Sequence, residues 1–282
     1  MLNIMIPKTI HYCWFGKGPK SKLILYCIDT WKNYLSEYKF VEWNEESFDV
    51  NSHPYTKTAY AAGKYAFVSD YVRAYVLHKH GGIYLDTDVE IKATLNPFLS
   101  HQAFSGFEGP NFPFTAVWGS VMGHRWPDAV LKSYENAQFD INDWTTNTRA
   151  VSDLVSLEFG INRSNDEFQL GSHGVAIYPS STFCLDLPMN VATHHFGGSW
   201  LEIERRNHFK YQINRKWRTT NLAGYLRSDD IGEGVADFIL ILGVRKVFSA
   251  LLLVLFRKVI KAFIPIFLRK AIKRSFLRRS QA

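Results

Sequence analysis

The chain has 282 residues, of which 46% are hydrophobic and 15% aromatic. This composition is typical of folded proteins and excludes a disordered chain, whereas the length allows either one large core or two smaller ones. The three cysteines, Cys13, Cys27 and Cys184, form no C-x-x-C pair. They therefore indicate neither a disulfide framework nor a zinc site, and we expect each to be a small buried residue in a reducing compartment.

The net charge of +7 is unevenly distributed along the chain. Of the 33 Lys and Arg residues, 11 lie after Asp237, in a stretch without a single acidic residue. The other 22 stand against all 26 acidic residues, so residues 1–237 carry a net charge of −4. Nucleic-acid-binding proteins usually carry their basic residues on the folded domain. The distribution therefore argues against a nucleic-acid partner and predicts one folded domain, residues 1–235, followed by a basic tail, residues 236–282.

The first part of the chain predicts alternating strands and helices. Strands are expected over residues 6–16 and 38–44, and helices over residues 21–35 and 56–82, the second helix ending at a Gly81–Gly82 cap. A third strand is expected over residues 83–91. The order strand, helix, strand, helix, strand predicts an α/β domain with a Rossmann-like sheet and parallel strands in its first half.

The second part of the domain continues in the same manner. The apolar patterns predict strands over residues 103–108 and 115–123 and helices over residues 126–137 and 148–159. A further apolar segment, residues 174–186, leads to the sequence THHFGGSW at residues 193–200. No internal repeat or low-complexity linker precedes residue 235, so a single domain is expected.

Two aspartates stand in the otherwise apolar strand predicted over residues 83–91. Side chains alternate between the two faces of a strand, so Asp86 and Asp88 are expected to share one face with Tyr84, opposite the apolar residues. Two carboxylates at this spacing repel each other unless a cation or a proton lies between them. For an isolated D-x-D pattern, a solvated strand face is the simpler interpretation.

The position of the aspartates favours a ligand site. Ligands of open α/β sheets bind at the carboxyl ends of the strands, and Mg²⁺ and Mn²⁺ prefer carboxylate oxygens. On the preceding helix, Asp70 and Arg73 are three residues apart and share a face. Arg73 could contact a phosphate or a ribose, or it could simply pair with Asp70.

These segments together resemble glycosyltransferase family 32. The pattern S-D-x-x-R…G-G-x-Y-x-D-x-D at residues 69–88 is similar to the DXD segment of that family, which includes the yeast-type initiating mannosyltransferases, the α-1,4-galactosyltransferases and many bacterial polysaccharide enzymes. Residues 6–16 resemble the opening motif of the family and residues 193–200 its closing motif. Family members often carry a Gly-Pro segment where this chain has TTNTRAVSD, residues 145–153, which leaves the acceptor open.

The resemblance implies a GT-A type fold, a mixed sheet flanked by helices, and a retaining, metal-dependent transfer of a hexose or N-acetylhexosamine from a UDP- or GDP-sugar. It implies that Asp88, Asp86 and His194 lie at a Mn²⁺ or Mg²⁺ ion, and that Asp70 and Arg73 lie at the donor sugar. The donor-binding residues implied in this way are Trp14, Tyr84, His194, Ser199 and Trp200.

Several of these assignments have an alternative. A core position is as well supported for Trp14 as a place against the nucleotide base. His194 and its neighbour His195 cannot both face the metal from an extended segment, and the motif favours His194. His11 is expected to satisfy nearby backbone groups, and Gly197–Gly198 to allow a mobile loop.

The basic tail predicts membrane association. After Pro265, Lys270, Arg274 and Arg278 recur every fourth residue, with apolar residues on the opposite side, as in an amphipathic helix on an anionic membrane surface. The longest charge-free run, residues 247–256, is shorter than the roughly 20 residues that span a bilayer. The N-terminus lacks the pattern of a secretory signal. We therefore expect a peripheral protein on the cytoplasmic face of the membrane, although the tail could instead bind a partner protein.

A lipid-linked saccharide acceptor in surface polysaccharide synthesis, such as that of a capsule, fits this location. Two other functions use the same features. A haloacid-dehalogenase-type phosphatase also carries D-x-D after a strand, although usually after the first strand of its domain. A non-catalytic, membrane-bound protein could bind a sugar nucleotide through the same residues.

Overall fold

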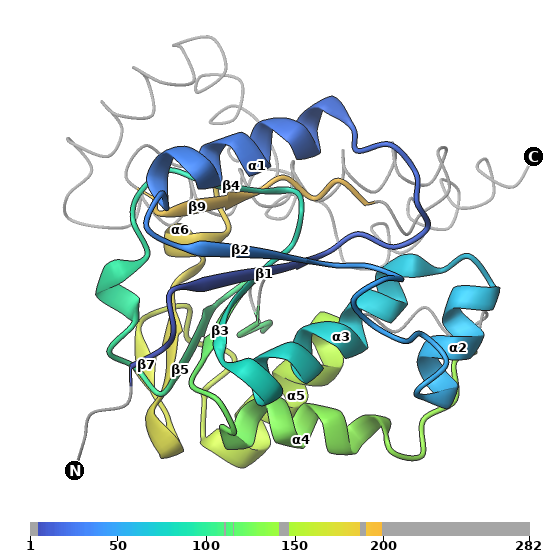
Figure 1. The fold of residues 1–282 in the computed structure, drawn as a ribbon. Coiled ribbons are helices and arrows are strands. Elements are labelled where there is room, and N and C mark those ends of the chain that lie inside the picture. The colour runs from blue at the N-terminus through green and yellow to red at the C-terminus, as the bar shows by residue number, and fades with distance from the viewer. Residues whose placement is uncertain (1–4, 110, 115, 141–146, 187–189, 199–282) are drawn as a thin grey trace, which may run out of the picture. The chain divides into compact units, whose positions relative to one another are not determined.

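The computed structural model describes residues 5–109, 111–114, 116–140, 147–186 and 190–198. All of them lie within one compact unit of the chain, Met1–Lys210. The predicted basic tail, Ser199 and Trp200 lie outside the described residues, and their assignments stay predictions. Figure 1 shows the described residues as a coloured ribbon.

The first elements follow the predicted order, with one difference. They are β1 (Thr9–Cys13), α1 (Lys22–Tyr34), β2 (Lys39–Trp43), α2 (Pro54–Ala61), α3 (Tyr65–His80) and β3 (Gly82–Leu85). The single helix expected over residues 56–82 is wrong, because the chain breaks into α2 and α3 at Gly63, which has a φ of 68° that a continuing helix does not allow. Gly81, with a φ of 63°, ends α3 as predicted.

The second half of the described domain adds shorter elements. They are β4 (Val89–Ile91), a 3₁₀ turn (Asn96–Phe98), β5 (Ala103–Gly106), β6 (Val117–Ser120), α4 (Arg125–Tyr134), α5 (Asn147–Phe159), β7 (Gln169–Leu170), a second 3₁₀ turn (Ser172–Gly174), β8 (Val175–Tyr178), α6 (Ser180–Phe183) and β9 (Ala192–His194). The strands and helices expected from the sequence in this region are therefore present. The strands β5 and β6 are shorter than expected, and α4 and α5 each begin one residue earlier.

The main sheet has seven strands in the order β2-β1-β3-β6-β5-β8-β7. The strands β2, β1 and β3 are parallel, as predicted, whereas β6 runs antiparallel to both of its neighbours, β3 and β5. Helices α3, α4 and α5 cover one face, and α1 lies on the other with the small β4–β9 sheet (Figure 1). Apolar side chains fill both layers. This mixed sheet flanked by helices confirms the predicted fold class.

The strand expected over residues 83–91 is in fact two strands of different sheets. All four residues of β3 are buried, the Tyr84 side included, so the expected division into a core face and a solvent face is wrong. The chain turns at Asp86, where the Val89 amide donates to the Asp86 carbonyl at 3.0 Å, and continues as β4, which pairs with β9. A turn, and not strand alternation, therefore brings the two aspartates together.

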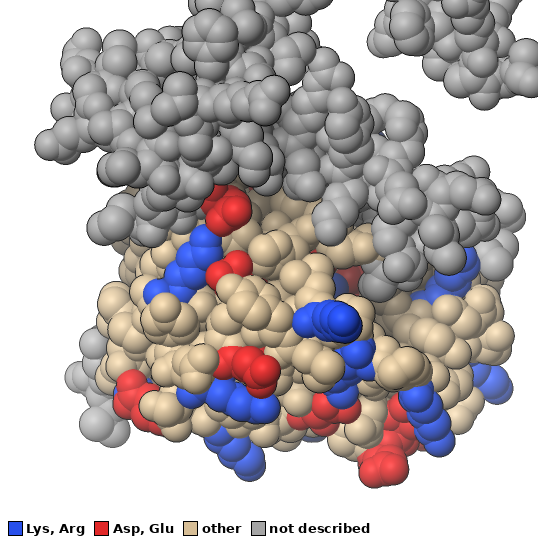
Figure 2. Space-filling model, turned by 90° about the horizontal axis from the view of Figure 1, so that it is seen from above, with Lys and Arg blue, Asp and Glu red and all other residues tan. Residues whose placement is uncertain are grey.

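The three cysteines are buried, as predicted. Charged side chains of both signs are interspersed over the described part of the face shown in Figure 2. Lys32 and Asp29 form one exposed ion pair, at 3.3 Å. No helix among the described residues is long and apolar enough to cross a membrane.

Candidate active site

The strand directions gather acidic residues at one edge of the main sheet. Because β3 and β5 are both antiparallel to β6, they run parallel to each other and end at the same edge. Asp86 follows β3 directly, and its amide donates to the carbonyl of Ala116, the residue before β6. Glu108 follows β5 two residues after its end. Carboxyl ends of neighbouring strands are where α/β domains bind ligands.

Asp86, Asp88 and His194 form a group that could hold a metal ion. One ligand atom from each of the three lies within 4.8 Å of the others. The pairing of β4 with β9 sets Val89 opposite His194. This brings the imidazole to the turn that carries Asp86 and Asp88, called the aspartate turn below, where its Nε2 lies 3.5 Å from Asp88 Oδ1. Two carboxylates and one imidazole suit Mn²⁺ or Mg²⁺, so the residues present fit the predicted ion.

The electrostatics of Asp88 and His194 are coupled. Burial alone would raise the pKa of Asp88, but the imidazole of His194 and the Gly197 amide outweigh it and lower this pKa to about 2. Burial alone would lower the pKa of His194, but Asp88 outweighs it and raises this pKa well above its usual value. The pair therefore provides an ionised carboxylate, whereas His194 would have to release its proton before its Nε2 could bind the ion.

Gly197 holds the chain after β9 against Asp88. Its amide donates to Asp88 Oδ2, and the amide of His195 donates to the Asp88 carbonyl at 3.0 Å. A Cβ atom at position 197 would lie 2.9 Å from Asp88 Oδ2, closer than real Cβ contacts allow. The sequence reading assigned this glycine only to a mobile loop and missed its contact with the aspartate.

His194 and His195 face different partners, as the extended segment requires. His194 faces Asp88, whereas His195 Nε2 lies 2.9 Å from Glu90 Oε2. The other Glu90 oxygen accepts a hydrogen bond of 2.8 Å from Tyr26 of α1. This second set of contacts ties the β4–β9 sheet to α1 and supports the aspartate turn from behind.

Arg73 joins two of the predicted aspartates. Its Nη2 lies 2.8 Å from Asp70 Oδ1 and 3.1 Å from Asp86 Oδ1, and its side chain is only 11% exposed. Burial lowers the pKa of Arg73, but the nearby carboxylates outweigh it and the net shift is upward. The sequence left two alternatives for Arg73, a simple pair with Asp70 or a place in the site. Both hold, because one guanidinium contacts Asp70 on α3 and Asp86 in the aspartate turn.

Tyr84 lies against Arg73. The residue is 2% exposed, and the Arg73 Cζ atom lies 4.9 Å from its ring centroid, in a cation–π arrangement. The structure therefore gives Tyr84 a role in positioning Arg73, and its direct contact with a donor stays a prediction.

Burial has the largest effect on the pKa of Asp70. Burial raises its pKa to about 6 even though Arg73 acts in the opposite direction. The side-chain amide of Asn147, at the start of α5, donates to Asp70 Oδ1 at 3.1 Å. We refer below to Asp70, Arg73, Asp86, Asp88 and His194 as the charged cluster.

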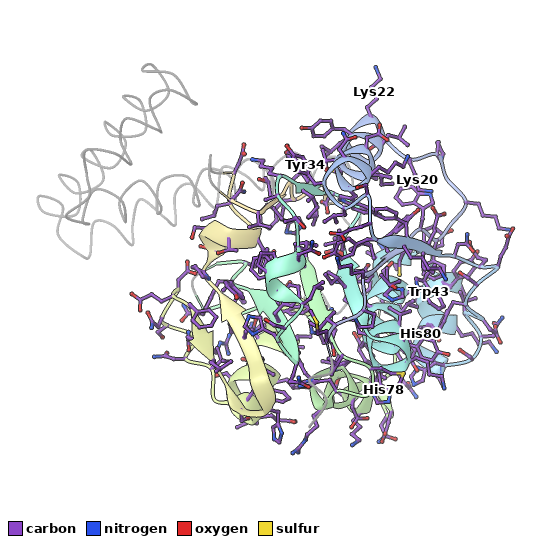
Figure 3. The ribbon with its side chains drawn as sticks, turned by 60° about the vertical axis from the view of Figure 1, so that its left-hand side comes forward. Lys20, Lys22, Tyr34, Trp43, His78 and His80 are labelled. Atoms are coloured by element: carbon purple, nitrogen blue, oxygen red, sulfur yellow. The ribbon has the colours of Figure 1, made fainter. Side chains whose placement is uncertain are left out.

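Trp14 lies at the carboxyl end of β1, outside the core. Its ring is partly exposed, its Nε1 donates to the Gly18 carbonyl at 2.8 Å, and Lys20 Nζ lies 5.3 Å from the ring centroid. Lys20 projects from the chain before α1 (Figure 3) and is held by Glu42 at 2.9 Å. The core alternative for Trp14 is therefore wrong, and its ring is available to a ligand.

His11 has a structural role, as predicted. Trp43 Nε1 donates to His11 Nδ1 at 3.1 Å, which leaves Nε2 to donate to the Gly81 carbonyl at 2.9 Å. Burial lowers the pKa of His11 to about 4, so it is neutral at physiological pH. Figure 3 shows Trp43 close to His80, and the centroids of the Trp43 and His80 rings are 5.6 Å apart.

Glu108 is a residue of the site that the sequence reading missed. Burial raises the pKa of its carboxyl, and the charges that act on it are those of His194, Asp86 and Arg73. The signal was present in the sequence, because the strand predicted over residues 103–108 ends on this one acidic residue. Without a motif to support it, a single glutamate at a strand end could not be distinguished from a solvated one.

The comparisons with known proteins agree with the site. Residues 21–105 match the family model described as a glycosyltransferase sugar-binding region containing a DXD motif. The chain is 32% identical over 142 residues to inositol phosphoceramide mannosyltransferase 3 of Schizosaccharomyces pombe, with 48% of this chain and 39% of the relative covered. It is 27% identical over 144 residues to a mannosyl phosphorylinositol ceramide synthase of Saccharomyces cerevisiae, with 47% and 36% covered.

The chain thus spans about two fifths of the length of the curated relatives it matches. Among solved structures, the PaToxG glycosyltransferase aligns at a TM-score of 0.40 and 17% identity over 55% of this chain and 69% of that one. The family match covers residues 21–105, and the resemblance to glycosyltransferase family 32 is confirmed.

Proposed function

We propose that the protein is a metal-dependent, retaining glycosyltransferase that moves a hexose from a UDP- or GDP-sugar to a lipid-linked acceptor. The observation that carries this proposal is the charged cluster, in which a possible metal group, Asp86, Asp88 and His194, lies beside the Asp70–Arg73 pair. The four residues from Asp70 to Asp88 lie within the segment that matches the DXD family model, and His194 contacts Asp88 from outside it.

Asp88 would be the principal ligand of a divalent cation, with Asp86 and His194 beside it. Asp88 stays ionised mainly because of His194, with a smaller effect from the Gly197 amide, and the contact with Gly197 fixes the orientation of the carboxylate. When bound, such an ion neutralises the diphosphate leaving group of a nucleotide sugar. Ser199 and Trp200, which follow directly in the chain, stay candidates for contacts with the phosphates.

The remaining residues of the cluster would act on the sugar and the base. Arg73 is fixed by two carboxylates and by Tyr84, so it can orient Asp86 and Asp70 without moving itself. Asp70 would accept hydrogen bonds from donor-sugar hydroxyls. Trp14 lies at the end of β1, at the same sheet edge as the end of β3, and its accessible ring suits stacking on a nucleotide base.

The names of the relatives favour one substrate class. Both curated relatives are named as enzymes that mannosylate an inositol phosphoceramide, which is a lipid. We therefore place mannose first among the possible hexoses and a lipid-linked molecule first among the acceptors, and a saccharide carrier for a capsule is the second choice. The basic tail would hold the enzyme at the cytoplasmic face of an anionic membrane as a peripheral protein.

The geometry is less favourable to a phosphatase. A nucleophilic aspartate must be free to attack phosphorus, but Asp86 is paired with Arg73 and Asp88 with His194 and Gly197. The motif also follows β3 and not the first strand of the domain.

Thermal unfolding with a panel of nucleotide sugars tests the proposal. A ligand at 100 times its Kd stabilises a protein by about 2.7 kcal/mol, which is roughly 5–10 °C in Tm for a domain of this size. We expect such a shift with at least one of GDP-mannose, UDP-glucose, UDP-galactose and UDP-N-acetylglucosamine, in the presence of Mn²⁺ and not in EDTA. The Asp88→Asn variant should show no shift. Phosphate release from a phosphomonoester, without stabilisation by any nucleotide sugar, would support the phosphatase instead.

A further inference from the structure

Glu108 is held rigidly at the edge of the site. Its amide donates to the Phe112 carbonyl at 2.9 Å, closing a tight turn after β5, and its carbonyl accepts a bond from Cys184 Sγ at 3.5 Å. The carbonyl of Cys184 in turn accepts from the His194 amide at 2.9 Å. The backbone of Glu108 is therefore linked through one residue to the segment that carries His194.

The side chain of Glu108 is directed toward the charged cluster. Its carboxyl forms a hydrogen bond with the Thr148 side chain in the first turn of α5, and its charge interacts with His194, Asp86 and Arg73. The residue is half-buried, and burial raises the pKa of its carboxyl. A carboxylate has about four acceptor positions, so the bond with Thr148 does not by itself prevent Glu108 from accepting a further hydrogen bond.

The first turn of α5 supports two carboxylates at once. Asn147 donates to Asp70 at 3.1 Å, and its neighbour Thr148 bonds to Glu108. After burial, the largest effect on the pKa of Asp70 is that of Arg73, and the largest effect on the pKa of Glu108 is that of His194. One helical turn therefore holds both carboxylates.

The charge of Glu108 decides which part of a nucleotide sugar it can meet. A carboxylate repels the diphosphate, but it accepts hydrogen bonds from the hydroxyls of a neutral sugar, and a poorly hydrated carboxylate gains most from such donors. We propose that Glu108 contacts the transferred sugar and accepts a hydrogen bond from one of its hydroxyls, with Thr148 as the residue that positions it. This assignment rests on the proposed function and adds a residue outside the DXD motif to it.

Calorimetric titrations of the full chain with Mn²⁺ separate this role from a general role in folding. Each of GDP-mannose, UDP-glucose and UDP-galactose is compared with its own nucleoside diphosphate, GDP or UDP. Glu108→Gln should weaken binding of the nucleotide sugar about 10- to 100-fold and change binding of the nucleoside diphosphate less than about twofold. Thr148→Val should weaken binding of the nucleotide sugar, relative to that of the nucleoside diphosphate, about 3- to 10-fold. Thr148→Ser keeps the hydroxyl and should bind the nucleotide sugar like the wild type.

Glu135 is an exposed carboxylate at the end of α4. Glu135→Gln is therefore the matched control and should bind the nucleotide sugar like the wild type. The inference is overturned if Glu108→Gln binds the nucleotide sugar as the wild type does, or if it loses nucleotide sugar and nucleoside diphosphate equally. If the wild type itself binds none of the nucleotide sugars, the proposed function fails, and the role of Glu108 fails with it. Equal binding of a nucleotide sugar by the wild type and Glu108→Gln is a different result, because it overturns the role of Glu108 and leaves the proposed function intact.

Discussion

Replacing Arg73 by Met tests how the charged cluster holds the site together. Arg73 lies 2.8 Å from Asp70 and 3.1 Å from Asp86, and the side chains of the three residues are 11%, 15% and 24% exposed. Removing the partner of a buried ion pair costs about 3–5 kcal/mol, because the remaining charge stays buried without compensation. At 2–4 °C per kcal/mol, the Tm should fall by roughly 6–20 °C.

A second substitution separates the electrostatic cause from a loss of packing. The Arg73→Met, Asp70→Asn double variant removes one of the two uncompensated carboxylates and should regain a substantial part of the lost Tm. Lys132→Met is the control, because Lys132 also lies 2.8 Å from an aspartate, Asp128, but on the exposed face of α4. Its Tm should change by less than about 2 °C. Scanning calorimetry at pH 7.5 measures all three, and a Tm loss in Arg73→Met no larger than that in Lys132→Met would refute this reasoning.

Three other predictions concern single contacts of the site. Gly197→Ala places a Cβ atom 2.9 Å from Asp88 Oδ2 and should weaken Mn²⁺ binding about 10-fold or more in a calorimetric titration, whereas Gly18→Ala, which meets no atom within 4 Å, should bind like the wild type. Burial raises the pKa of Asp70 to about 6, so the protonated carboxyl contributes fully to the free energy of unfolding below about pH 4, and this contribution is lost as the pH rises through 6. The free energy of unfolding, measured against pH, should show this fall in the wild type and not in Asp70→Asn. Trp14→Leu should weaken nucleoside diphosphate binding about 10-fold with an unchanged Tm, and an unchanged affinity would remove Trp14 from the site.

Local periodicity predicted most of the elements but not the course of the chain at the aspartates. The helix α1 and the strands β1 and β2 follow from apolar spacing and flanking polar residues, which act within a few residues of sequence. The alternation rule failed at β3 because a strand covered on both faces carries no division into core and solvent sides. The turn at Asp86 is favoured by the pairing of β4 with β9, a contact over 100 residues away in sequence.

The same distinction applies to the site. The pair Asp70 and Arg73 could be predicted because residues three apart on a helix share a face. The second bond of Arg73, to Asp86, and the contact of Gly197 with Asp88 depend on how separate elements pack, so the pattern of residues could not reveal them. The contact of the Tyr84 ring with Arg73 could not be predicted for the same reason, because it depends on how β3 packs against α3.

The release of nucleoside diphosphate from a nucleotide sugar tests the central claim most directly. Wild type and Asp88→Asn are incubated with GDP-mannose, or with the UDP-sugar that stabilises the wild type most, with Mn²⁺ or with EDTA. Supporting contacts of metal ligands are worth about 10- to 100-fold, so loss of the ligand itself should lower the Mn²⁺-dependent rate at least about 100-fold. Release by the wild type that is equal in Mn²⁺ and EDTA, or equal in wild type and Asp88→Asn, would contradict a metal-dependent glycosyltransferase built on Asp86, Asp88 and His194.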